Sequence, residues 1–201
     1  MRRLSAVLLA AAMLAALPGI VCAETVPDNG DWFNTPTATP APDAFRFREG
    51  IRWGMNQQQV QALESTKMTV QVKDNLSILR TDEKVAVSRF TADLIFMFRE
   101  NRLLMISYEF RNMSGTDDFN YLSEALSSLY GVKTTAEPMK IKALMDVVNP
   151  YHYQTDQIRE SGVWSAPDGT TIYLFYYAAD AFAIMYVSPE LGSRVYQTNG
   201  L

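Results

Sequence analysis

Two apolar runs separated by a short polar turn constrain the fold of this chain most strongly. Residues 94–98 are continuously apolar, whereas residues 103–110 alternate, with Tyr108 and Phe110 on the apolar side and Ser107 and Glu109 on the polar side. The intervening Glu100-Asn101-Arg102 is typical of a hairpin turn. Because strands joined by so short a turn run antiparallel, the pattern predicts an antiparallel sheet.

Further strands are predicted on both sides of this hairpin. Valines alternate at Val70 and Val72 and again at Val85 and Val87, and residues 170–177 and 181–187 form two more apolar runs. Trp164 is predicted to begin another strand, and Pro167-Asp168-Gly169 after it is a strong turn signal. Short connections again favour antiparallel neighbours.

Three helices are predicted between these strands. Asn56 and Gln59 have the spacing of a capping box and begin a short helix over residues 57–65. Apolar residues at helical spacing predict a second helix from Thr116 to the stop at Gly131. A third is predicted over residues 138–148, between Pro138 and Pro150.

The element order predicts an α+β fold. We expect a mostly antiparallel sheet with two or three helices packed on one face, a two-layer sandwich that could consist of two helix-plus-meander halves. A single domain is predicted over residues 44–191. Residues 24–43 are rich in proline and threonine and predict a disordered linker, and residues 192–201 are expected to be a C-terminal tail.

The first 23 residues resemble a secretory signal peptide. Arg2 and Arg3 precede an apolar segment, and Val21 and Ala23 occupy the small-residue positions of a cleavage site. Val21 directly before Cys22 argues against lipid attachment at that cysteine. The sequence therefore predicts export to a periplasm or the exterior, with no stable transmembrane segment in the mature chain.

Composition excludes several function classes. The chain of 201 residues carries a formal net charge of −4 and has no basic stripe, which argues against a nucleic-acid partner. It contains one cysteine and one histidine, so metal sites and disulfide frameworks built on these residues are excluded. Neither a cofactor nor a metal is predicted.

The run Gly50-Ile51-Arg52-Trp53-Gly54-Met55-Asn56, followed by Gln58, Gln59 and Val60, resembles the opening of a secreted bacterial superfamily. Its members are similar to the β-lactamase inhibitor protein and to the SmpA/OmlA lipoproteins. The resemblance continues at Phe96, Phe98, Asn101, Leu103, Tyr108, Phe110, Leu126, Tyr130-Gly131, Trp164, Thr171-Ile172, Leu174, Tyr186 and Ser188. It implies helices on an antiparallel sheet whose other face often contacts a protein partner. The mature chain departs from these relatives in lacking both the inhibitor's disulfides and the lipid-bearing cysteine.

The candidates for catalysis are few. His152 is the sole possible imidazole base, beside Asp156 and within reach along the chain of Ser161 or Ser165, but no nucleophile-elbow motif accompanies it. Carboxylate pairs of the glycosidase type could come from Asp93, Glu109, Asp117, Asp118 and Glu160. Each of these acids also has a structural interpretation, and we predict no catalytic residues and no enzymatic activity.

Aromatic residues crowd the second half of the chain. On a strand, Tyr173, Phe175 and Tyr177 share one face and Ile172, Leu174 and Tyr176 the other. If helices cover the aliphatic face, the aromatic set together with Trp164 would be open to an extracytoplasmic protein partner. The alternatives are binding of cell-wall glycan or peptidoglycan, carboxylate-based hydrolysis, a purely structural role, or a sheet in which both faces are core.

Overall fold

The predicted hairpin forms the centre of the sheet. A computed structural model describes residues 48, 50–73, 75–148, 155–178 and 180–197, all in one compact unit. In it β4 (Phe90–Arg99) pairs antiparallel with β5 (Arg102–Arg111), with a register shift between Met97 and Phe98. Glu100 and Asn101 have φ values of 53° and 59°. Two successive left-handed residues twist the turn in the sense that an antiparallel hairpin requires.

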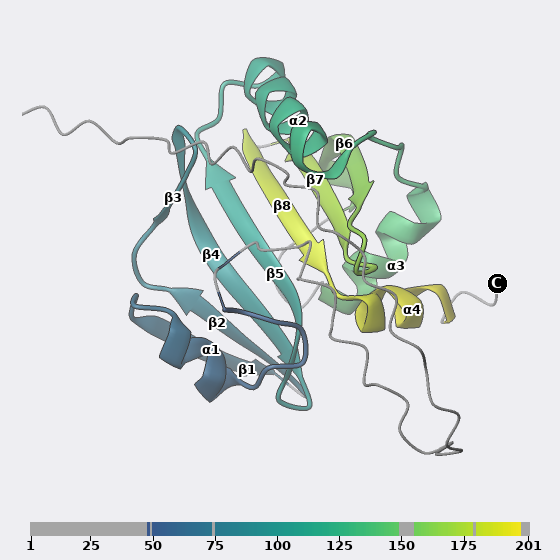
Figure 1. Ribbon diagram of the computed structural model, residues 1–201. Coiled ribbons are helices and arrows are strands. Elements are labelled where there is room, and N and C mark those ends of the chain that lie inside the picture. The colour runs from purple at the N-terminus through teal and green to yellow at the C-terminus, as the bar shows by residue number, and fades with distance from the viewer. Residues whose placement is uncertain (1–47, 49, 74, 149–154, 179, 198–201) are drawn as a thin grey trace, which may run out of the picture. The chain divides into compact units, whose positions relative to one another are not determined.

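Eight strands form one antiparallel sheet, in the order β1-β2-β4-β5-β8-β7-β6, with β3 paired to β4 outside this path (Figure 1). The remaining strands are β1 (Met68–Lys73), β2 (Leu76–Thr81), β3 (Val85–Val87), β6 (Ile158–Ser165), β7 (Thr171–Tyr177) and β8 (Ala181–Val187). The α+β class and the antiparallel sheet are confirmed.

The chain order repeats a helix followed by a meander. Helix α1 (Gln57–Leu63) precedes the strands up to β5, and α2 (Thr116–Tyr130) and α3 (Pro138–Val148) precede β6, β7 and β8. The last strand of each half, β5 and β8, pair with each other along Met105 to Arg111. The sheet therefore consists of two meanders joined at their final strands.

Helices α1 and α2 pack on one face of the sheet, which we call the α2 face. Val60 of α1 and Phe119, Leu122 and Leu126 of α2 are buried there. They belong to one apolar cluster with the strand residues Leu79, Leu94, Phe96, Phe110, Ile172, Leu174, Tyr176 and Ile184. The α1 capping box is present, with Asn56 accepting from the Gln59 amide and Gln59 accepting from the Asn56 amide.

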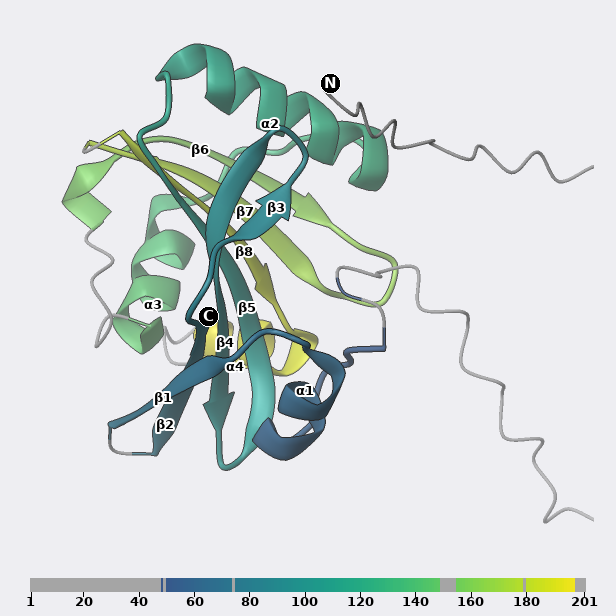
Figure 2. The same cartoon turned by 90° about the vertical axis from the view of Figure 1, so that its left-hand side faces the viewer.

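Helix α3 and a further helix, α4 (Pro189–Gln197), pack on the opposite face, which we call the α3 face. Leu144 and Val148 of α3 and Leu191 and Val195 of α4 are buried in a second apolar cluster. Its strand members include Ile78, Ile95, Met97, Met105, Tyr173, Phe175, Tyr177 and Met185. In Figure 2, α1 and α3 lie on opposite sides of the sheet.

The expectation that the helices share one face is therefore wrong, because the architecture has three layers. Tyr173, Phe175 and Tyr177 of β7 form an apolar set on the α3 face, and the amphipathic helix α3 packs against this set.

Other boundaries also differ from those expected. The chain continues as helix past the boundary expected at Leu191, and Val195 is buried. Trp164 lies near the end of β6 rather than at its start. None of the described helices combines the length and apolar character needed to cross a bilayer.

Candidate functional site

The aromatic residues predicted to bind a partner lie in the core. Tyr173 is 5% exposed, Phe175 0% and Tyr177 8%, all on the α3 face. The rings of Tyr173 and Phe175 stack with centroids 5.5 Å apart, and α3 belongs to the same apolar cluster. The prediction of an exposed aromatic face is wrong, and the alternative in which both sheet faces are core is the one observed.

Trp164 does not share a face with the three β7 aromatics. It pairs with Ile172 across β6 and β7, is 1% exposed, and belongs to the cluster of the α2 face. Its indole nitrogen donates to the Ser127 hydroxyl of α2 at 3.1 Å. Trp164 therefore fixes α2 to the sheet and leaves no ring surface for a partner.

The candidate catalytic groups are mostly dispersed. His152 lies outside the described residues. Asp118 accepts from the Ser114 amide and from Arg89, each at 2.6 Å, so it stabilises the start of α2. Asp117 is in the same first helical turn, and Glu160 lies on β6. The structure brings one pair of predicted acids together, Asp93 and Glu109.

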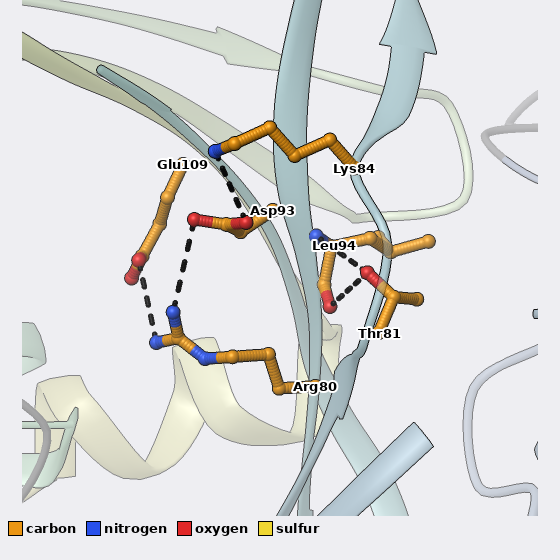
Figure 3. Close-up of polar contacts among 6 residues, drawn as sticks. All are labelled: Arg80, Thr81, Lys84, Asp93, Leu94 and Glu109. Carbon is orange, nitrogen blue, oxygen red and sulfur yellow. Dashed lines mark hydrogen bonds and ion pairs between the residues drawn. The ribbon is translucent and has the colours of Figure 1, made fainter. Parts of the chain in front are cut away.

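Asp93 and Glu109 belong to a mixed charge cluster on the α3 face (Figure 3). They are directly opposed on β4 and β5. Arg80 of β2 contacts Asp93 at 3.8 Å and Glu109 at 3.4 Å, and Lys84 contacts Asp93 at 3.2 Å. On the other face, Thr81 exchanges hydrogen bonds of 3.3 and 3.4 Å with the Leu94 backbone and holds β2 against β4.

Each acid of this pair is also an ion-pair partner. Arg80 contacts both carboxylates and Lys84 contacts Asp93, so the two acids have a structural role in joining β2, β4 and β5. Nearby, burial raises the pKa of the Tyr177 phenol, and the negative charge of Glu109 raises it further. Among the described residues, no group of three or more His, Cys, Asp or Glu side chains could hold a metal ion.

The open surface of the sheet lies at β1 instead. Residues 69–72 are four consecutive exposed residues of an edge strand, so they are accessible on both faces. Val70 is 43% exposed and Val72 is 72% exposed, and Leu63 of the neighbouring α1 is 49% exposed. Exposed valines on a sheet edge are a known site of pairing with another chain.

The hydrogen-bonding pattern shows which backbone groups this edge presents. The Asp82 amide donates to the Lys67 carbonyl at 2.9 Å, which makes that pair a hydrogen-bonded one. Because such pairs alternate along an antiparallel ladder, Thr69 and Gln71 also bond inward to β2. The N–H and C=O groups of Met68, Val70 and Val72 therefore point to the outer edge.

The opposite end of the sheet is partly covered. Thr134 forms an antiparallel bridge with Val163 of β6, with N–O distances of 2.8 and 3.0 Å. That connection occupies the middle of the β6 edge, whereas no described strand lies beyond β1.

The alternation of Val70 and Val72 predicted a strand from the sequence. It could not predict that this strand lies at an edge, because alternation carries no information on the order of strands in a sheet.

Searches of protein-family models, curated proteins and solved structures gave no match to this chain. The resemblance to the inhibitor-like and SmpA/OmlA-like superfamily stays a prediction. The surface at β1 is consequently interpreted from its own geometry.

Proposed function

We propose that the chain is an exported, non-enzymatic binding module that recognises a protein partner by accepting an extended partner segment beside β1. The observation that carries the proposal is the open β1 edge, where exposed Val70 and Val72 also aim their backbone groups outward. Export is supported by the signal-like residues 1–23. The partner would then be an extracytoplasmic protein.

Adding a partner strand at the β1 edge would supply both main-chain hydrogen bonds and side-chain contacts to the complex. Main-chain hydrogen bonds to the outward groups of Met68, Val70 and Val72 would give affinity, and alternate side chains of the partner would give specificity. The valine side chains supply apolar area that is otherwise left in water. The buried aromatics have no part in this surface, although their rigid packing supports the sheet.

Substitution by proline tests the backbone contribution. Val70→Pro removes an outward N–H but no β1–β2 hydrogen bond, and proline is tolerated on an edge strand. The chain from residue 24 onward would be used to capture partners from the source organism's envelope and medium, and the purified partner would then be titrated. We expect Val70→Pro to weaken binding at least about tenfold, with a nearly unchanged urea midpoint.

The matched control is Val70→Thr, which keeps the N–H and the β-branched shape. It should retain most of the affinity. A partner that binds wild type and Val70→Pro equally well would place its site elsewhere and overturn the proposal. The same would follow if only insoluble peptidoglycan, and no protein, retained the chain.

The second candidate function, carboxylate-based hydrolysis of wall glycan, is favoured by one observation, the opposition of Asp93 and Glu109. Its test is turnover of purified peptidoglycan fragments by wild type, Asp93→Asn and Glu109→Gln. Turnover that either substitution abolishes would establish this function and exclude a non-enzymatic module. Absence of turnover by the wild type would remove this candidate.

A further inference from the structure

The chain enters the described fold at the end of α1, close to where β1 begins. Arg48, the first described residue, donates from Nε to Oε1 of Glu64 at 2.6 Å, and the Glu64 side chain is 4% exposed. A Cβ at Gly50 would lie 3.4 Å from the side chain of Leu63, the last residue of α1. The N-terminal part of the chain is therefore anchored where residues 64–67 lead from α1 into β1.

Three exposed apolar side chains near this anchor lie on the α2 face. Val70 pairs with Leu79 of the α2-face cluster, and Val72 shares its face because side chains alternate along a strand. Leu63 belongs to α1, which packs on the same face. All three are exposed in the described part of the chain. An apolar segment that lay beside β1 on this face would remove them from water.

The sequence that precedes Arg48 contains such a segment. Between residues 24 and 47, apart from Val26, large apolar side chains occur only at Trp32-Phe33 and at Phe45 and Phe47. Trp32-Phe33 is the one pair of adjacent aromatic residues in this stretch. Aromatic side chains supply large contact areas, so this pair has the most apolar surface to bury.

Reach distinguishes the aromatic pair from the two later phenylalanines. Phe45 lies three residues before Arg48, which corresponds to about 10 Å of extended chain, whereas β1 is about 20 Å long. Trp32 lies sixteen residues before Arg48, so it can reach up to about 50 Å from the anchor. Residues 34–44 between them contain three prolines and no apolar side chain larger than alanine, as a spacer would. Trp32 can therefore reach every position along β1.

The tether also favours this segment over a separate molecule. A site and a ligand joined by a short flexible linker meet at an effective concentration in the millimolar range. A tethered segment with only millimolar intrinsic affinity thus occupies its site for much of the time, while a separate protein must compete at its own concentration.

We propose that Trp32-Phe33 docks reversibly on the apolar surface formed by Leu63, Val70 and Val72 and competes there with the protein partner. The contact is autoinhibitory, since the partner binds only those molecules in which the surface is vacant. This inference rests on the proposed strand addition at β1 and adds its regulation. Residues 34–44 act as the spacer that sets the effective concentration.

The fluorescence of Trp32 tests the docking. Its emission is the difference between the spectra of the chain from residue 24 onward and of its Trp32→Phe variant, because Trp53 and Trp164 are common to both. The reference is a synthetic peptide of residues 24–47. We expect Trp32 in the protein to emit at shorter wavelength than in the peptide and to be quenched less strongly by acrylamide. Identical emission and quenching in the two would overturn the inference.

Two matched variants locate the contact. Val72→Asp places a carboxylate on the proposed surface, and Val132→Asp makes the same change after α2, at a side chain that is 88% exposed. Val72→Asp should shift the Trp32 emission to that of the peptide, whereas Val132→Asp should leave it unchanged. Equal effects of the two variants would overturn the inference. Cooperative urea unfolding of both variants shows that each is folded.

The partner titration measures the competition. When the effective concentration is about twice the intrinsic dissociation constant, the surface is vacant in about one third of the molecules. Trp32→Ala/Phe33→Ala should therefore tighten partner binding about threefold, whereas Val70→Pro should weaken it. Loss of partner binding in the double variant would overturn the inference, because the aromatic pair would then itself contact the partner.

The remaining outcomes separate this inference from the proposed function. If Val70→Pro weakens partner binding but Trp32→Ala/Phe33→Ala does not change it, strand addition holds and the autoinhibition is wrong. If Val70→Pro has no effect on the partner, the proposed function fails and the competition fails with it. If dilution from about 100 μM to about 1 μM moves the Trp32 emission to that of the peptide, the segment docks on a second copy of the chain, which overturns the intramolecular contact.

Discussion

Asp93 and Glu109 lie directly opposite each other on β4 and β5, and their carboxylates contact the two terminal nitrogens of one guanidinium, that of Arg80. Opposed like charges on neighbouring strands are destabilising. We therefore expect Arg80→Met to lower the free energy of unfolding by about 1 kcal/mol. Because salt screens the repulsion, the loss should shrink at about 1 M salt. Urea denaturation at two salt concentrations measures both effects.

Two further variants control for the apolar stem of Arg80. Arg80→Lys keeps the charge and should recover part of the stability, although one ammonium cannot reach both acids as a planar guanidinium does. Adding Asp93→Asn to Arg80→Met removes the like-charge pair and should recover stability at low salt. A loss for Arg80→Met that is the same at both salt concentrations would show that packing, not charge, explains its effect.

Gly162 of β6 lies under the Trp164 ring. A Cβ at this position would come within 2.7 and 3.1 Å of two indole carbons and within 2.8 Å of the Lys133 side chain. Lys133 is flexible and can move, but the indole is buried and bonded to Ser127. We expect Gly162→Ala to cost about 1–3 kcal/mol of unfolding free energy, as overpacking does. Chemical denaturation checks this value.

A double-mutant comparison shows whether the indole is the cause. In a Trp164→Leu background the ring is absent, so Gly162→Ala should cost less than it does in the wild type. The same cost in both backgrounds would mean that the backbone of β6, rather than contact with Trp164, requires glycine.

The local elements of this fold were largely predictable, because each has a short-range signal. Asn56 and Gln59 indicated the start of α1, and Glu100 and Asn101 indicated the central turn. Strand β2 and helix α4 were missed. The β2 residues alternate poorly, since Ile78 and Leu79 are buried on opposite faces, and α4 buries few of its residues.

The candidate site was not predictable, because it depends on which strands lie at the edges and on where helices pack. The alternation at Tyr173 and Phe175 indicates a face but not its cover, and α3 supplies that cover from a distant part of the chain. Asp93 and Glu109 were two of five candidate acids. Only the β4–β5 register separates them from the others.

The burial of Tyr173 gives a direct test of the three-layer architecture. Removing this ring from the α3 face would leave a cavity beside Phe175, so we expect Tyr173→Ala to lower the unfolding free energy by about 3 kcal/mol or more. Val72→Ala, at a side chain that is 72% exposed, should change it by less than about 0.5 kcal/mol. Equal stability of the two variants would contradict the placement of the aromatics in the core.

Buried tyrosines should make the protein sensitive to alkaline pH. Burial raises the pKa of Tyr108, Tyr177 and Tyr186 above the ordinary value of 10.0, and the charge of Glu109 adds to this for Tyr177. In the unfolded chain these phenols ionise near pH 10, while the folded state keeps them protonated. Unfolding therefore releases protons above this pH, and each phenol lowers the unfolding free energy by up to about 1.4 kcal/mol per pH unit.

The contribution of these groups is fully present below about pH 9 and is lost as the pH rises through and beyond 10. Urea denaturation between about pH 8 and pH 11 measures the slope. Tyr177→Phe keeps the buried ring and removes one ionising group, so its stability should fall less steeply than that of the wild type above pH 10. Since other groups titrate in this range, the difference between the two slopes is the decisive quantity. Parallel slopes would show that the Tyr177 phenol is ionised as readily in the folded protein as in the unfolded chain.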